Sequence, residues 1–223
     1  MGAVNSAASR VTNTGQLAIP ESTATVRAYE IAAEYTSPAL LHHSVRAYLW
    51  AAALARQERI EFDPELLWVA AMFHDVGLVE AFDNHRLAFE EAGGHLAKVF
   101  AAGLGWSPQR RTRLHEIIVR HMWPSVESAA DPEGHLLERS TGIDISGREI
   151  DTLTTELRGE ILARWPRLRL AEEFTNCFRD QAARKPHTSA ATALANGLAT
   201  RLITNRLEHH HPPAQRQTTT PRG

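Results

Sequence analysis

The sequence contains a single cysteine, Cys177, among its 223 residues. One cysteine excludes an internal disulfide framework and any zinc site built from several cysteines. Structural disulfides are also rare in reducing compartments, so this composition is in keeping with a cytoplasmic protein, which we expect.

The sequence also has no long apolar run and no excess of one charge. No segment approaches the ~20 apolar residues of a membrane-spanning helix, and no early basic cluster precedes an apolar stretch as in a signal peptide. The formal net charge is -2, and basic residues are spread along the chain. We therefore expect a soluble protein with a small-molecule substrate, and neither nucleic acid nor a membrane as its partner. A homo-oligomer is compatible with the sequence.

Composition predicts one folded domain between two flexible terminal segments. The chain is 43% hydrophobic, enough for a substantial core. Residues 1–18 are rich in small and polar residues, which predicts a flexible N-terminal segment. We expect the domain to cover residues 19–207. Residues 208–223, which include His209, His210 and His211, are predicted to form a disordered tail.

Helix signals recur almost throughout the chain. Three serine-proline or aspartate-proline pairs, at 37–38, 63–64 and 107–108, place an N-cap residue before a proline at the first helical position. They predict helices that run to about Gln57, to His74 and to near His121. Further amphipathic runs predict helices over 86–101, 148–164 and 189–207. No alternating run lies between hairpin turns, so we expect an all-α bundle of roughly seven to nine helices.

The dipeptide His74-Asp75 ends the second of these helices. The preceding residues Leu67, Ala70 and Ala71 place His74 on a face that should point into the core. A carboxylate beside it is costly to bury unless a cation compensates. A helix-terminal histidine followed by a capping aspartate is the structural alternative.

Two further residues suggest a metal site. His43 lies in "LLHHSVRAY", on the helix that begins after Ser37, and Asp144 lies in "STGIDISG", on a candidate buried helix face. With His74 and Asp75 they offer two imidazoles and two carboxylates from three helices. Such a set suits one divalent ion, Zn²⁺ in the first place and Fe²⁺ or Mn²⁺ as alternatives.

The strings "HHSVRAY", "FHDVGL" and "TGIDISG", in this order and at this separation, resemble the HD-domain metalloproteins. The strings "HRLAFEEAGG", "IIVRHMWPS" and "RKPHTS" make the chain similar to the cyanamide hydratase branch, and the resemblance covers roughly residues 17–205. It implies an all-α HD-domain-like fold and a metal held by His43, His74, Asp75 and Asp144. It also implies hydration of a small nitrile, cyanamide to urea, by a metal-bound hydroxide.

Several nearby residues are candidates for the substrate pocket. Asp75 and His121 are predicted to take part in proton transfer, and His121 also to contact the substrate. Arg46 is predicted to bind a substrate, with an ion pair to a buried acid as an equal alternative. Phe89 and Glu90 are expected to line the pocket, although helix packing explains them equally well.

The remaining histidines within the predicted domain are not predicted metal ligands. His42 points about 100° away from His43 around the helix, so His43 is the predicted ligand. His85, His95, His115, His135 and His187 are expected to be surface or packing residues.

Two other functions remain open at this point. A phosphohydrolase acting on a nucleotide or another phosphate ester would need cations near the metal. The sequence has Arg46 and Arg86 but Leu78 where many HD phosphodiesterases carry lysine, and no glycine-rich phosphate loop. A non-catalytic ligand-binding protein would not need two buried carboxylates beside two histidines.

Overall fold

The computed structural model describes residues 17–208, and every statement about the structure refers to that part of the chain. Apart from residues 17, 18 and 208, the predicted flexible segment and tail lie outside the described residues. The same holds for His209, His210 and His211.

The predicted all-α fold is confirmed, with α-helices, short 3₁₀ turns and no strand between residues 17 and 208. The ten α-helices α2 to α11 slightly exceed the predicted number. In chain order the elements are α2 (Thr23–Tyr35), α3 (Pro38–Glu58), α4 (Pro64–Phe73), η1 (Val76–Leu78), α5 (Phe89–Gly103), α6 (Pro108–Arg120), α7 (Pro132–Ser146), η2 (Ile150–Thr152), α8 (Thr155–Arg164), α9 (Leu170–Arg184), α10 (Ser189–Ala195) and α11 (Leu198–Thr204).

The three helices predicted from proline and N-cap pairs begin where expected. Ser37, Asp63 and Ser107 are the N-cap residues of α3, α4 and α6. Each side chain accepts a hydrogen bond from the backbone N–H three residues further on, at 3.0 to 3.2 Å. These bonds satisfy donors that a helix start otherwise leaves unpaired.

Two predicted helices are wrong in their boundaries. The run 148–164 is interrupted, because Thr154 caps a separate helix, α8, after the 3₁₀ turn η2. The run 189–207 is divided at Gly197, whose φ of 82° is left-handed and separates α10 from α11. Apolar periodicity continues across both breaks, so the pattern alone could not reveal them.

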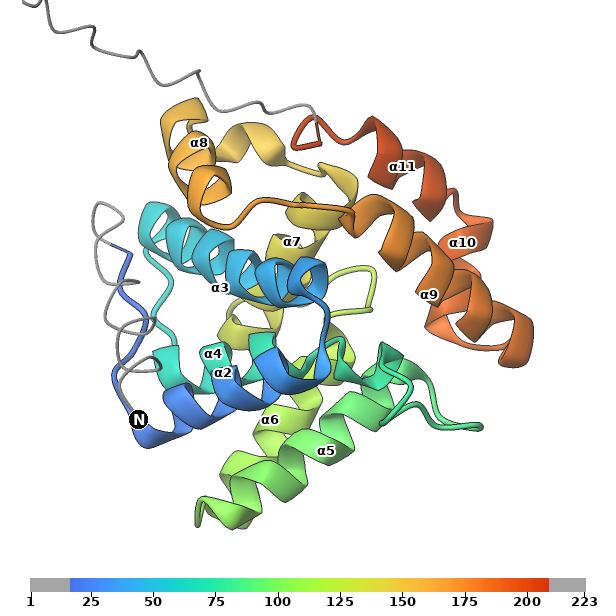
Figure 1. The fold of residues 1–223 in the computed structure, drawn as a ribbon. Helices are drawn as coiled ribbons and strands as arrows, with labels where there is room; N and C mark the ends of the chain where they lie inside the picture. The colour runs from blue at the N-terminus through green and yellow to red at the C-terminus, as the bar shows by residue number, and fades with distance from the viewer. Residues whose placement is uncertain (1–16, 209–223) are drawn as a thin grey trace, which may run out of the picture.

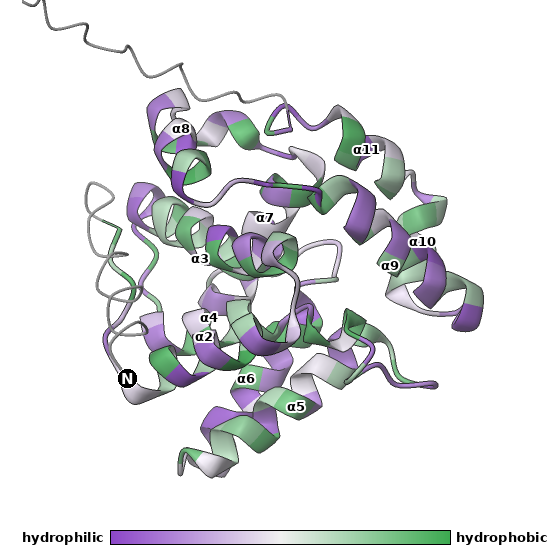
Figure 2. Cartoon of the chain, viewed as in Figure 1, coloured by the Kyte–Doolittle hydropathy of each residue, from purple (hydrophilic) through white to green (hydrophobic). Residues whose placement is uncertain are grey.

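Helix α3 runs through the middle of the molecule, with α2 and α4 on one side and α7 behind it (Figure 1). Helices α5 and α6 lie side by side, and α9, α10 and α11 form a separate group. Polar and apolar residues alternate along α2, as expected for a helix with one buried face (Figure 2).

Helix α4 is the most deeply buried element, with every residue from Leu66 to Phe73 in the core. Its ten residues are too few to cross a bilayer. Across residues 17–208, no helix combines the length and apolar character that crossing a membrane would require.

Two glycines bring α5 directly against the end of α4. A Cβ atom on Gly77 would lie 2.0 Å from the carbonyl oxygen of Phe89, and one on Gly93 would lie 2.7 Å from that of Phe73. Both positions therefore require glycine, and the backbone around His74 and Asp75 is packed tightly against another backbone.

Candidate metal centre

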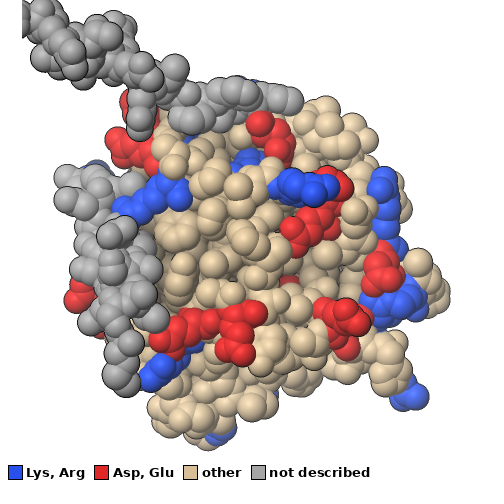
Figure 3. All heavy atoms as spheres, in the orientation of Figure 1, with Lys and Arg blue, Asp and Glu red and all other residues tan. Residues whose placement is uncertain are grey.

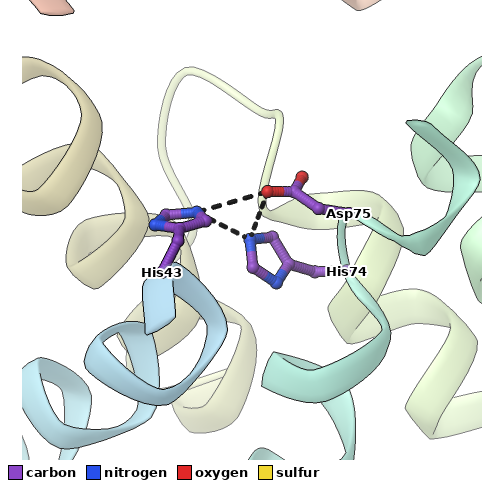
Figure 4. A group of neighbouring side chains, drawn as sticks. All are labelled: His43, His74 and Asp75. Carbon is purple, nitrogen blue, oxygen red and sulfur yellow. Dashed lines mark hydrogen bonds and ion pairs between the residues drawn. The ribbon is translucent and has the colours of Figure 1, made fainter. Parts of the chain in front are cut away.

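Three predicted ligands meet in the core. His43 extends from α3, and His74 and Asp75 come from the end of α4 (Figure 4). The Nε2 atoms of the two histidines lie 3.1 Å apart, and they lie 3.2 and 3.1 Å from Oδ2 of Asp75. All three side chains are buried, and their potential ligand atoms lie within 4.8 Å of one another.

The other ring nitrogen of each histidine is tied to an oxygen. Nδ1 of His43 lies 2.7 Å from Oδ2 of Asp144, and Nδ1 of His74 lies 2.8 Å from the carbonyl oxygen of Ala71. Because these oxygens accept hydrogen bonds, the proton belongs on Nδ1. The Nε2 lone pairs are then left facing each other, which is the arrangement that metal-binding histidines use.

His121, the C-cap residue of α6, lies beside this group. Its Nε2 is 3.9 Å from Oδ1 of Asp75, and its ring packs edge-on against that of His74. Its Nδ1 donates to the carbonyl oxygen of Ile118, so a third Nε2 lone pair faces the same space.

The carboxylate of Asp75 provides the test of whether a cation fits here. Both of its oxygens are buried, and neither accepts a hydrogen bond from the described residues. A buried carboxylate without donors is costly, as are two facing lone pairs. A divalent cation resolves both problems, so the residues fit a metal ion.

The electrostatics of the group agree with this fit. Burial alone would lower the pKa of His43, but the hydrogen bond with Asp144 and the nearby negative charge of Asp75 raise it above its ordinary value. Burial would raise the pKa of Asp75, but His74 and His43 hold it well below its usual range. The potential that draws a proton to His43 also draws a metal cation. Burial, reinforced by the charge of His74, lowers the pKa of His121 to about 3, so this imidazole is neutral near pH 7.

Asp144 lies on the far side of His43 from Asp75. Its two oxygens accept hydrogen bonds from Nε and Nη2 of Arg46, both at 2.8 Å, and from Nε1 of Trp50 at 2.9 Å, besides the bond with His43. The charge and hydrogen bonds of Arg46, together with the charge of Arg167 and the hydrogen bond with His43, hold its pKa well below the ordinary value against the opposing effect of burial. Ligation by Asp144 itself stays a prediction.

Arg46 is fully buried and faces Asp144 instead of the cavity. Its Nη1 also donates to the carbonyl oxygens of Trp165 and Pro166, at 3.0 and 3.1 Å. The structure therefore favours the ion pair that the sequence left as the alternative to substrate binding. His42 turns away, with Nδ1 2.9 Å from the carbonyl oxygen of Pro166.

The three clustered residues and His121 line a cavity of about 210 Å³. Its apolar wall includes Met122, Ile145, Phe174 and Phe178, and its polar groups include Glu138, Thr141, Arg148 and Arg201. Helices α9, α10 and α11 supply part of this wall, through residues such as Phe174, Ala193 and Leu198. Sequence reasoning missed these wall residues, because helical periodicity marks a buried face without saying what it faces.

Phe89 and Glu90 lie next to the site but are not part of the cavity wall. The ring of Phe89 packs against those of His121 and Phe178, with centroids 5.7 and 5.3 Å apart. Glu90 is buried, and burial raises the pKa of its carboxyl group. Their predicted contact with a substrate remains untested.

Comparison with known proteins agrees with this geometry. Residues 40–138 match the family model of the HD domain. The chain is also 28% identical over 172 residues to cyanamide hydratase DDI2 of Saccharomyces cerevisiae, and equally to cyanamide hydratase DDI3 of the same yeast. Each alignment covers 74% of this chain and 75% of the relative. The predicted resemblance is confirmed, and it supports a metal-dependent HD-type hydrolase or hydratase.

Proposed function

We propose that this protein hydrates a small nitrile, with cyanamide as substrate and urea as product. The observation that carries the proposal is the unpartnered carboxylate of Asp75 beside three Nε2 lone pairs, at the wall of a mostly apolar cavity. The 28% identity to the yeast cyanamide hydratases supports the choice of substrate.

His43, His74 and Asp75 would hold the ion, and Nε2 of His121 faces the same space without being needed as a ligand. When bound, a divalent ion polarises a substrate and lowers the pKa of water to about 7. We assign Asp144 a supporting role, because its hydrogen bond fixes the proton of His43 on Nδ1 and directs Nε2 towards Asp75. Arg46 and Trp50 hold that carboxylate in place.

The reaction adds the oxygen of water to the nitrile carbon and one of its protons to the nitrile nitrogen, and tautomerisation then gives urea. His121 is the proposed proton carrier. Its neutral ring keeps Nδ1–H on Ile118, so Nε2 would accept a hydrogen bond from the attacking water and pass the proton on to the substrate nitrogen as the C–O bond forms, without holding it as an imidazolium. The sequence suggested that His121 donates to, or orients, the nitrile nitrogen, whereas this tautomer makes Nε2 an acceptor first. The carboxylate of Asp75 orients the water.

The surroundings of the site suit an uncharged substrate. The rings of Phe174 and Phe178 stack with centroids 4.5 Å apart and form an apolar wall beside His43. Such a wall excludes water and strengthens the few polar contacts within it.

The ion, compartment and partners belong to the same proposal. Two or three imidazoles with one carboxylate suit Zn²⁺ first, with Fe²⁺ and Mn²⁺ as alternatives. We propose a cytoplasmic enzyme of small molecules that binds neither nucleic acid nor membranes, and homo-oligomers are compatible with it. Acidic and basic side chains are interspersed on the face in Figure 3, without the broad basic surface that nucleic acid requires.

A second candidate, a phosphate-ester hydrolase, rests on one observation that the sequence did not provide. Arg148 and Arg201, far apart in the chain, both line the cavity. Arg148 pairs with Glu138, another residue of the wall, whereas the described contact of Arg201 is a backbone carbonyl, that of Asn196. A guanidinium group in this position would bind a phosphate.

The test measures urea release from cyanamide by metal-loaded protein, beside hydrolysis of a generic phosphodiester. His43→Ala and His74→Ala are expected to abolish turnover and reduce metal content. His42→Ala is the matched control, because His42 is the neighbouring histidine on α3 but faces Pro166. His121→Gln should retain the metal while kcat falls by ~10²–10⁴.

Each outcome distinguishes one function from another. Urea release that depends on His43 but not on His42 supports the hydratase. Phosphodiester cleavage that requires both His43 and Arg201 would replace it with the second candidate. Metal binding without either reaction would leave a ligand-binding protein. Normal turnover by His121→Gln would remove the proposed proton carrier.

A further inference from the structure

A second group of ligand-type side chains lies between α5 and α6, outside the cavity. Glu91 and His95 are four residues apart on α5, so they share one helix face, and His115 faces them from α6. Oε2 of Glu91 lies 3.2 Å from Nε2 of His115, and the two imidazole rings have centroids 4.9 Å apart. One ligand atom from each residue lies within 4.8 Å of the other two.

The Nε2 atom of His115 lies at the centre of this group. Nε2 of His115 is buried, and no described residue forms a hydrogen bond with it. Oε2 of Glu91 lies close to this nitrogen, but the two groups are not aligned for a hydrogen bond. A buried imidazole nitrogen without a partner calls for a ligand.

The helix pair is shaped to admit the ring of His115. A Cβ atom on Gly94 would lie 2.8 Å from Cδ2 of this ring. A side chain at position 94 would therefore force the imidazole to shift from its observed place. The glycine therefore permits the side-chain arrangement that brings the three ligand types together.

We propose that Glu91, His95 and His115 form a second divalent-metal site that joins α5 to α6. Two imidazoles and one carboxylate are a common ligand set for Zn²⁺, with a fourth position open to water. The sequence led us to expect His95 and His115 to be surface or packing residues. It could not reveal their proximity, because only the fold brings α5 and α6 together.

The protonation state of the group agrees with this assignment. Burial lowers the pKa of His115, with the neighbouring His95 adding to the effect against Glu91. A lower pKa means that protons compete less with a metal ion for the ring nitrogen. Glu91 is partly exposed and His95 exposed, so an ion reaches the site from solvent.

The two sites are separate but share a helix. His115 precedes His121 by six residues on α6, a rise of about 9 Å along the helix axis. Neither Glu91, His95 nor His115 lines the central cavity. An ion between α5 and α6 would fix the helix that ends at His121, and would do so whether or not the proposed hydratase reaction takes place.

The experiment measures Zn²⁺ bound per chain by equilibrium dialysis and elemental analysis, across a series of free Zn²⁺ concentrations. We expect one class of tightly bound ion and a second, weaker class. His95→Ala should lower the affinity of the second class by at least ~10-fold and leave the first unchanged. Glu91→Gln preserves the shape of the side chain and should have the same effect. His187→Ala is the control, because it removes an exposed histidine elsewhere.

The three consecutive histidines 209–211 can bind Zn²⁺ themselves, so every protein is measured both with its natural tail and with these residues changed to serine. Thermal unfolding provides a second measurement, in which added Zn²⁺ should raise the Tm less for His95→Ala than for His187→Ala. The proposal is overturned if no second class exists once the tail is changed. It is equally overturned if His95→Ala and Glu91→Gln bind Zn²⁺ as His187→Ala does.

Discussion

The pairing of Arg46 with Asp144 allows a sharp test of what holds the metal centre in place. The change Asp144→Asn keeps the shape of the side chain but removes its charge. Both partners have side chains with no solvent exposure. An amide would also turn a donor towards a guanidinium group that itself only donates. Arg46 would then be buried without its counter-charge.

The expected loss of stability follows from this burial. Removing one partner of a buried ion pair costs ~3–5 kcal/mol. In a domain of this size, that loss lowers the Tm by roughly 6–20 °C. The matched control is Glu149→Gln, which removes the charge of a half-exposed carboxylate that pairs with Arg139 at 2.7 Å. An exposed pair of this kind contributes about 1 kcal/mol or less.

The assay is urea-induced unfolding of both variants and the parent protein, first in excess EDTA and then with Zn²⁺. In EDTA the measurement reports the ion pair without any contribution from a metal. With Zn²⁺, Asp144→Asn should also lower metal affinity by ~10–100-fold, because the acceptor that directs Nε2 of His43 loses its negative charge.

One result would refute this reasoning directly. If Asp144→Asn and Glu149→Gln lose the same stability in EDTA, the buried pair does not hold the bundle together. If stability falls as expected but Zn²⁺ binding is abolished as completely as by His43→Ala, Asp144 is itself a ligand, as the sequence suggested.

Three further predictions use other parts of the structure. Gly77→Ala should destabilise the protein by at least ~1–3 kcal/mol in urea unfolding, because its Cβ would overlap the backbone of Phe89; equal stability to Gly103→Ala, which meets nothing within 4 Å, would contradict this. Burial raises the pKa of Cys177 to about 11, so iodoacetamide at pH 8.5 should alkylate it about 100-fold more slowly than in the unfolded chain; comparable rates would contradict it. Removing the metal with EDTA should lower the Tm of the parent but not of Asp75→Asn, and an equal loss in both would place the stabilising ion elsewhere.

The helices that carry the candidate ligands were predicted well from the sequence, because the signals for their starts lie within a few neighbouring residues. The N-cap and proline pairs at Ser37, Asp63 and Ser107 act within one helical turn, so they place the starts of α3, α4 and α6 without knowledge of the fold. Those are the helices that hold His43, His74 and His121. Once the start of a helix is fixed, the position of each residue around the helix axis follows, and this determines which side chains point inward.

Partnerships across the bundle could not be predicted in the same way. The sequence offered Arg46 two equal roles, and only the packing of α7 against α3 places Asp144 beside it. The same applies to Arg201, which reaches the cavity because Gly197 redirects the chain before α11. Contacts between residues 50 to 100 positions apart depend on how helices pack, and apolar periodicity does not encode the partner.

The distribution of the central side chains along the chain also has a kinetic consequence. His43, His74 and His121 come from α3, α4 and α6, and each is separated from the next by a helix–helix connection. Closing those loops before any ion–ligand bond forms is unfavourable, so an ion cannot nucleate folding. We expect the bundle to assemble first and the ion to enter afterwards. A metal held by these residues should therefore slow unfolding and leave the refolding rate unchanged, because it stabilises the folded state and not the transition state for folding.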